Sequence, residues 1–109
     1  MALDTGLTTS DLAIWLRIGD DEAIAEQEVL EMLISAAEEI VENELGHNFE
    51  GEDIPEQVRK SILKLATSDY ERRQAGLEFE TLSVHQSNYK RALDEIRGDL
   101  WPYRKIVGF

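Results

Sequence analysis

The sequence predicts an all-α protein: a small helical bundle of about four helices in a single domain, residues 1–109, with an extended arm between the third and fourth helices and an apolar C-terminal tail. Three observations predict it. Apolar residues recur every three or four positions along most of the chain, which is the period of a helix with one buried face. Glycine and proline lie outside the longest periodic segment. Cysteine is absent, so no disulfide framework replaces a hydrophobic core.

The first two predicted helices cover residues 8–18 and 22–45. In the first, Leu12, Trp15 and Leu16 lie three and four positions apart, and we expect Trp15 to pack in the core. The second is the best-defined element, because it contains no glycine or proline. Its broad apolar stripe consists of Ala23, Leu30, Leu33, Ile34, Ala37, Ile40, Val41 and Leu45.

Two other faces of the helix at 22–45 have a distinct character. One is an acidic ridge formed by Glu28, Glu31, Glu38, Glu39 and Glu42. The other is a second apolar sector formed by Ala25, Val29, Met32 and Ala36. A helix in a small monomer needs only one buried stripe. The second sector therefore indicates a neighbouring subunit or, in a compact bundle, a place beneath the first helix.

The second half of the chain predicts two further helices. One begins at Pro55, a favoured residue at a helix start, and its core stripe consists of Val58, Ile62, Leu63, Leu65, Ala66 and Tyr70. Residues 77–88 alternate apolar and acidic positions and then change register, which predicts an extended arm or loop. The last helix is limited by Pro102, and one of its faces carries Tyr89, Leu93, Ile96 and Leu100.

The arm at 77–88 and the tail at 101–109 are the predicted partner-binding segments. Both lack a helical period that would anchor them to the bundle, and both are more apolar than free loops or termini normally are. Aromatic residues and arginine are enriched in interface cores. The candidate partner-binding residues are Leu77, Phe79, Leu82, Val84, Trp101, Tyr103, Arg104, Ile106 and Phe109.

The net charge of −12 arises almost entirely in the first half of the chain. Residues 1–54 contain 15 acids and one base, Arg17, whereas residues 55–109 contain 8 acids and 10 bases. Binding DNA through its phosphates requires a concentrated positive surface, so this composition argues against that function. The asymmetry can serve solubility alone. It can also serve self-assembly in which the acidic half of one copy meets basic patches of the next.

The sequence offers little material for catalysis, and we expect neither an enzyme, nor a cofactor, nor a metal site. It has two histidines, and its carboxylates fall on solvent-facing helix positions. The one metal-like spacing, Glu44-x-x-His47, occurs once and encloses Gly46, so a helix end followed by a loop histidine explains it. No apolar run approaches the ~20 residues that cross a bilayer, and the first residues lack signal-peptide features. We therefore expect a soluble protein of intracellular origin that binds no membrane.

Six short segments follow one another along nearly the whole chain. They are DLAIWLRI at 11–18, AAEEIVE at 36–42, IPEQV at 54–58, ILKLA at 62–66, DYERR at 69–73 and WPYR at 101–104. Their order and spacing resemble those of the head-tail connector proteins of tailed bacteriophages and prophages. The segment at 77–88 departs from the family pattern, because it is longer and more apolar than a minimal turn.

The resemblance implies a non-enzymatic structural subunit that is assembled in the host cytoplasm and located in the virion neck. Such a subunit forms a homo-oligomeric ring, docks on the portal, extends the DNA channel and links the filled head to the next neck, stopper or tail protein. DNA passes through without specific binding, and an acidic channel wall would favour this. The alternative from another class is an acidic helical adaptor or nucleic-acid mimic that inhibits a DNA-binding partner. A mimic of this kind has no use for an apolar tail.

Overall fold

The computed structural model describes residues 5–47, 49, 53–75 and 79–104, and within these ranges the side chains outside 74–87. The described elements are α1 (Thr9–Leu16), α2 (Asp20–Ala25), α3 (Gln27–Leu45), α4 (Glu56–Ala75), α5 (Phe79–Leu100) and the 3₁₀ turn η1 (Trp101–Tyr103). These residues contain no strand, so the predicted all-α bundle is confirmed. The molecule is elongated, measuring 47 × 28 × 19 Å along its principal axes.

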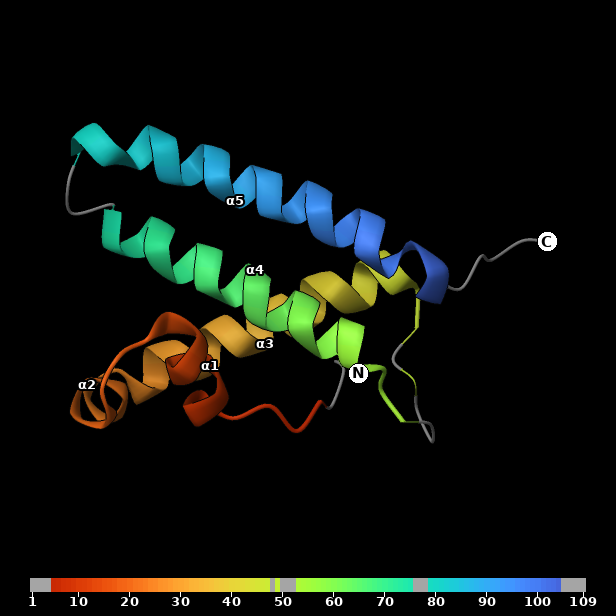
Figure 1. Ribbon diagram of the computed structural model, residues 1–109, viewed down its shortest axis with the longest axis horizontal. Helices are drawn as coiled ribbons and strands as arrows, with labels where there is room; N and C mark the ends of the chain where they lie inside the picture. Colours follow the sequence, from red (N-terminus) through yellow and green to blue (C-terminus); the bar gives the residue numbers. More distant parts are fainter. Residues whose placement is uncertain (1–4, 48, 50–52, 76–78, 105–109) are drawn as a thin grey trace.

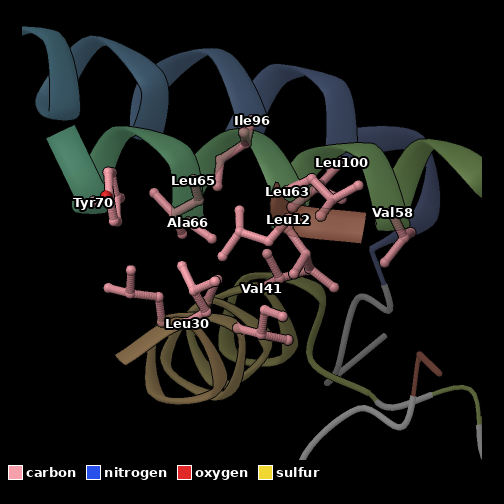
Figure 2. Close-up of a cluster of buried hydrophobic side chains, with 14 of the residues drawn as sticks. Leu12, Leu30, Val41, Val58, Leu63, Leu65, Ala66, Tyr70, Ile96 and Leu100 are labelled. Atoms are coloured by element: carbon pink, nitrogen blue, oxygen red, sulfur yellow. The ribbon is translucent and has the colours of Figure 1, made fainter. Parts of the chain in front are cut away.

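Helix α4 is the central element of the bundle. It packs against α1, α3 and α5, and its longest contact is with the neighbouring antiparallel helix α5 (Figure 1). Figure 2 shows side chains of α3 such as Leu30 and Val41 directed toward those of α4 and α5, with Leu12 of α1 between the layers. The single core of the protein therefore lies between α3 on one side and the α4–α5 pair on the other.

The predicted apolar stripes form this core. Every predicted stripe position of α4 is buried, and so are Ile96 and Leu100 of α5. The buried positions of α3 are Leu30, Leu33, Ile34, Ala37, Val41 and Leu45. Four further predicted positions are partly buried against the same cluster, namely Ala23, Ile40, Tyr89 and Leu93. Helical periodicity thus identified the core faces of α3, α4 and the second half of α5 correctly.

Local hydrogen bonds define both ends of α1. The backbone N–H of Thr8 donates to the Asp11 carboxylate at 2.8 Å, and the Asp11 N–H donates back to the Thr8 hydroxyl at 3.3 Å, which forms a capping box. At the other end Arg17 adopts a left-handed conformation with φ 60°, and its N–H donates to the Ile14 carbonyl. The helix therefore ends at Leu16, before Gly19, because two non-helical residues satisfy its last carbonyls.

The single helix predicted at 22–45 is wrong, because the chain is broken at Glu26 into α2 and α3. Glu26 has φ −106° and ψ 17°, outside the helical range, although its carbonyl still accepts the Leu30 N–H at 3.0 Å. Its carboxylate accepts a hydrogen bond from the Tyr70 hydroxyl of α4 at 2.6 Å. The break thus coincides with a tertiary contact, which no local sequence pattern specifies.

The extended arm predicted at 77–88 is also wrong for residues 79–88, because α5 begins at Phe79; residues 77 and 78 lie outside the described part of the chain. The apolar positions 82, 89, 93, 96 and 100 are seven, four, three and four residues apart, which is a helical spacing. The short alternation before them spans too few residues to specify an extended segment. Helix α5 therefore extends alongside most of α4.

Trp15 is not a core residue as predicted, since 43% of it is exposed. Leu12 and Ala13 supply the buried face of α1, with Leu16 partly buried beside them. Helix α1 has only 8 residues, so its buried face is narrow. Position 15 is rotated by about 60° from position 12 around the helix axis, which places the larger indole ring at the edge of that face.

Polar contacts fasten α4 to α5 outside the core. Lys64 of α4 pairs with Glu95 of α5, and this hydrogen bond, together with the Lys64 charge, lowers the pKa of the Glu95 carboxyl. The Arg72 guanidinium lies 4.2 Å from the ring centroid of Tyr89. Burial raises the pKa of Tyr89, and the nearby Asp69 acts in the same direction while Arg72 opposes it. These contacts fix the register of the two helices.

Truncating the core should test these assignments. Leu33→Ala or Ile62→Ala should lower the free energy of unfolding by about 2–5 kcal/mol, because each side chain is almost fully buried. Met32→Ala is the matched control, since Met32 is 59% exposed and its loss should cost less than about 0.5 kcal/mol. Urea denaturation followed by circular dichroism measures all three. A loss below about 1 kcal/mol for both core variants would contradict the proposed core.

A substitution at Ser61 should raise the free energy of unfolding rather than lower it. The Ser61 hydroxyl is buried on α4 and has no hydrogen-bond partner among the described residues, so the desolvation of this group is uncompensated. Ser61→Ala should therefore raise the free energy of unfolding by about 1 kcal/mol. Ser35→Ala on the exposed face of α3 is the control, because there only the difference in helix propensity, below about 0.7 kcal/mol, should appear. Destabilisation by Ser61→Ala in the same denaturation assay would show that the hydroxyl has a stabilising role.

Candidate functional site

The described residues expose five large apolar side chains at one end of the bundle, which we call the apolar end. They are Ile14, Trp15, Ile24, Val29 and Met32. Ile14 and Trp15 line one surface hollow, Ile14 and Ile24 line a second, and Ile24 and Val29 line a third. Because the hollows share residues, four of the side chains form one continuous surface across α1, α2 and the start of α3. Met32 lies about one turn beyond Val29 on α3.

The second apolar sector predicted on the helix at 22–45 belongs partly to this surface. Val29 and Met32 are 40% and 59% exposed, so α1 does not cover them. Ile14 and Ile24 are more exposed still, at 73% and 70%. Sequence reasoning missed both, since each lies outside the stripe of its helix. For Ile24, the sequence signal that could have indicated an exposed apolar side chain is its isolated position within the acidic segment at 20–28.

Carboxylates border the apolar end. Asp20 lines the hollow that contains Ile14 and Ile24, while Glu28 and Glu31 line the hollow that contains Val29. Glu31 accepts a hydrogen bond from Gln27 at 3.2 Å. Within the described part of the chain, none of these three acids forms an ion pair. The border around Ile24 and Val29 is therefore negative, whereas the hollow that contains Ile14 and Trp15 is lined by Arg59 as well as by Asp11 and Glu56.

The opposite end of the bundle carries a second exposed feature, Trp101 and Arg104, which we call the aromatic tip. Trp101 is 60% exposed. The Arg104 guanidinium lies 5.2 Å from the centroid of the indole ring, within the range of a cation–π contact. Helix α5 leads directly into η1, so the position of the aromatic tip is set by a rigid element.

Tyr103 and His47 anchor the aromatic tip to the bundle. Tyr103 is partly buried against the core, and its carbonyl accepts a hydrogen bond from His47 Nε2–H at 2.8 Å. The His47 ring in turn contacts Phe49, with 4.2 Å between ring centroids. Glu44, one turn earlier, pairs with Arg97 of α5 at 2.9 Å. The end of α3 thus holds the junction of α5 and η1 at two points.

These contacts also account for the Glu44-x-x-His47 spacing. Both side chains bind groups at the C-terminal end of the bundle, Arg97 and the Tyr103 carbonyl. Among the described residues, no three side chains of the types that ligate metals gather at one place. The spacing therefore has a structural explanation.

The structure places only some of the predicted partner-binding residues. Trp101 and Arg104 are exposed, and Tyr103 is partly buried. Phe79, Leu82 and Val84 lie in the first half of α5, where the side chains are not described. Leu77, Ile106 and Phe109 fall outside the described residues. The tail at 101–109 therefore contains one residue, Tyr103, that packs against the core, and its partner contacts stay a prediction.

The family of the protein is established by its sequence over almost the whole bundle. A model of the phage gp6-like head-tail connector proteins matches residues 7–104, which include every helix and η1. The chain belongs to this family. No curated protein and no solved structure gives a significant match. The connector is accordingly a structural protein of the phage neck, as the resemblance in its segment order implied.

Both exposed surfaces of the connector lie within the matched region. The apolar end is built by residues 14–32, and the aromatic tip by residues 101 and 104. No helix in the described part of the connector is long and apolar enough to cross a bilayer. The apolar end and the aromatic tip are the two candidate functional surfaces of the connector.

Truncation of the exposed Trp101 and of the anchored Tyr103 should change the stability by different amounts. Trp101→Ala should change the free energy of unfolding by less than about 0.5 kcal/mol, because most of the indole is already in water. Tyr103→Ala should cost about 1–3 kcal/mol, since it removes a ring packed against the core. Thermal melts of the two variants measure the difference. Equal losses, or a larger loss for Trp101→Ala, would show that the indole contributes to the internal packing.

Proposed function

We propose that the connector is a ring-forming subunit that docks on the phage portal, extends the DNA channel and links the filled head to the next neck or tail component. The observation that carries this proposal is the pair of different surfaces at the two ends of the bundle, one apolar with acidic borders and one aromatic with an arginine. A ring of identical subunits requires two different, complementary surfaces on each copy. A monomer that acts alone requires neither.

The charge of α3 supports a position beside passing DNA. Glu39 is exposed and Glu42 half-buried on this helix, and neither forms an ion pair among the described residues. The Glu38 carboxylate accepts two hydrogen bonds from Thr5, from its N–H at 3.3 Å and from its hydroxyl at 2.8 Å. A wall with this charge repels phosphates and gives the duplex no fixed binding position. DNA would therefore slide along it.

The alternative is an acidic helical adaptor that mimics nucleic acid and inhibits a DNA-binding partner. The acidic face of α3 is compatible with that role. However, a mimic acts through its charge alone and gains nothing from five exposed apolar side chains at one end and an exposed tryptophan at the other. The family match and the paired surfaces together favour the ring-forming connector.

Portal docking is tested by shortening the tail. Deleting residues 105–109 leaves the whole described bundle in place, including the bond between His47 and Tyr103, so the melting temperature should stay within about 3 °C. The same deletion should weaken binding to the cognate portal at least about tenfold, because apolar tail residues such as Ile106 and Phe109 are proposed to contact partners.

The matched control for this deletion is Lys60→Ala, which removes one positive charge, as loss of Lys105 does, from an exposed position on α4. Portal binding is measured by surface plasmon resonance, and negative-stain microscopy of the mixture shows whether rings form. Normal portal binding by the shortened chain would place the docking surface on the helices. The absence of rings with the full-length chain would contradict the ring itself.

A further inference from the structure

Exposed apolar side chains of the connector are divided unequally between its ends. Among the described residues six large apolar side chains are exposed, of which five form the apolar end and the sixth is Trp101. Burying such side chains is the main source of affinity in protein association. The apolar end is therefore the surface that gains most from a partner. Outside it, Trp101 is the one exposed large apolar side chain among the described residues.

The two surfaces cannot meet within one copy. Helix α2 and the start of α3 lie toward one end of the long axis of the molecule, α1 lies beside them and nearer the middle, and η1 lies at the other end (Figure 1). Between them lies the α3–α4–α5 core, which is held by continuous helices. A contact between the apolar end and the aromatic tip must therefore join two copies.

Charge decides which pairing of copies is stable. A two-fold contact between two apolar ends would bring Asp20, Glu28 and Glu31 of one copy against the same acids of the other, and such juxtaposed like charges oppose association. The partner of the apolar end must instead carry positive charge beside an apolar group. Arg104 provides that charge on the aromatic tip, at 5.2 Å from the Trp101 ring.

Other exposed bases fit the apolar end less well. Lys60, Lys90 and Arg91 are exposed on α4 and α5, and none forms an ion pair among the described residues. No exposed large apolar side chain accompanies them within the described surface of these two helices. They therefore have no group beside them that could fill an apolar hollow.

We infer that the connector associates head to tail, with Trp101 and Arg104 of one copy docked against Ile14, Ile24 and Val29 of the next copy. The inference rests on the proposed ring and specifies its interface. Trp101 would cover the hollows shared by these three side chains, and Arg104 would approach Asp20, Glu28 or Glu31. The contact joins two different surfaces, so it repeats from copy to copy and closes into a ring when the rotation between copies permits.

Two variants that each lose one side of the contact test the inference. Ile24→Asp adds a charge to the apolar end and leaves the aromatic tip intact. The double variant Trp101→Ala with Arg104→Glu removes the tip and leaves the apolar end intact. Each variant alone should associate at least about tenfold more weakly than the wild type. Circular dichroism establishes that both are folded, as expected for changes at exposed positions.

Mixing the variants should restore one contact. The intact tip of the Ile24→Asp variant can dock on the intact apolar end of the double variant, so the mixture should form one-to-one complexes that do not extend further. Sedimentation velocity between about 1 µM and about 1 mM detects them. Lys90→Glu is the matched control, because it reverses one exposed charge on α5 as Arg104→Glu does on the tip, and it should assemble like the wild type.

The outcomes separate this interface from the ring itself. If the wild type forms rings and either variant assembles as well as the wild type, or if the mixture stays monomeric, the head-to-tail interface is wrong and the ring uses other surfaces. If the wild type is monomeric at every concentration, the interface is wrong, whatever the portal does. If portal-bound samples also lack rings, the proposed function fails with it.

Discussion

The apolar surface of α4 is the constraint on which the rest of the structure depends. This helix buries Val58, Ile62 and Leu65 against its neighbours, and α1, α3 and α5 all pack on it. A chain of this length can build only one such core. Because α4 is covered on several sides at once, it has little surface left for a partner. The exposed large apolar side chains accordingly lie on α1, α2, the first half of α3 and η1, on the periphery of the core.

Ion pairs within the bundle change the meaning of the charge asymmetry. The second half of the chain has more bases than acids, but several of these bases are already occupied: Lys64 by Glu95, Arg72 by Asp69 and Arg97 by Glu44. The acids of α2 and α3 are mostly free of such pairs in the described structure. Each such pair removes one acid together with one base, so the net charge is unchanged, but fewer bases of the second half are left for a partner. Among the described residues, Arg104 combines a positive charge with an exposed aromatic ring at the end of α5.

Features that depend on one helix could be predicted from the sequence, and features that depend on two elements could not. The buried faces of α3 and α4 follow from apolar periodicity, since each repeats over nearly 20 residues. The break at Glu26 coincides with a hydrogen bond to Tyr70, which is 44 residues away. The start of α5 was not predicted, because a short alternation of apolar and acidic residues there is typical of an extended segment. The exposure of Trp15 was not predicted either, because the buried face of a short helix is narrow. The aromatic tip was anticipated at Trp101 and Arg104, whereas its anchor at His47 and most of the apolar end were not, because they are assembled from separate elements.

A neck protein has to remain soluble before assembly and still carry surfaces that associate. Apolar side chains alone would make any two copies adhere, and acids alone would prevent all contact. At the apolar end the two are combined, because Asp20 and Glu28 border the hollows that Ile24 lines. Like charge then opposes pairing between two identical ends, while a positively charged aromatic group meets no such barrier. The charge asymmetry suggested two roles, solubility and self-assembly, and the same carboxylates would serve both. They would repel the apolar end of another copy and attract its aromatic tip.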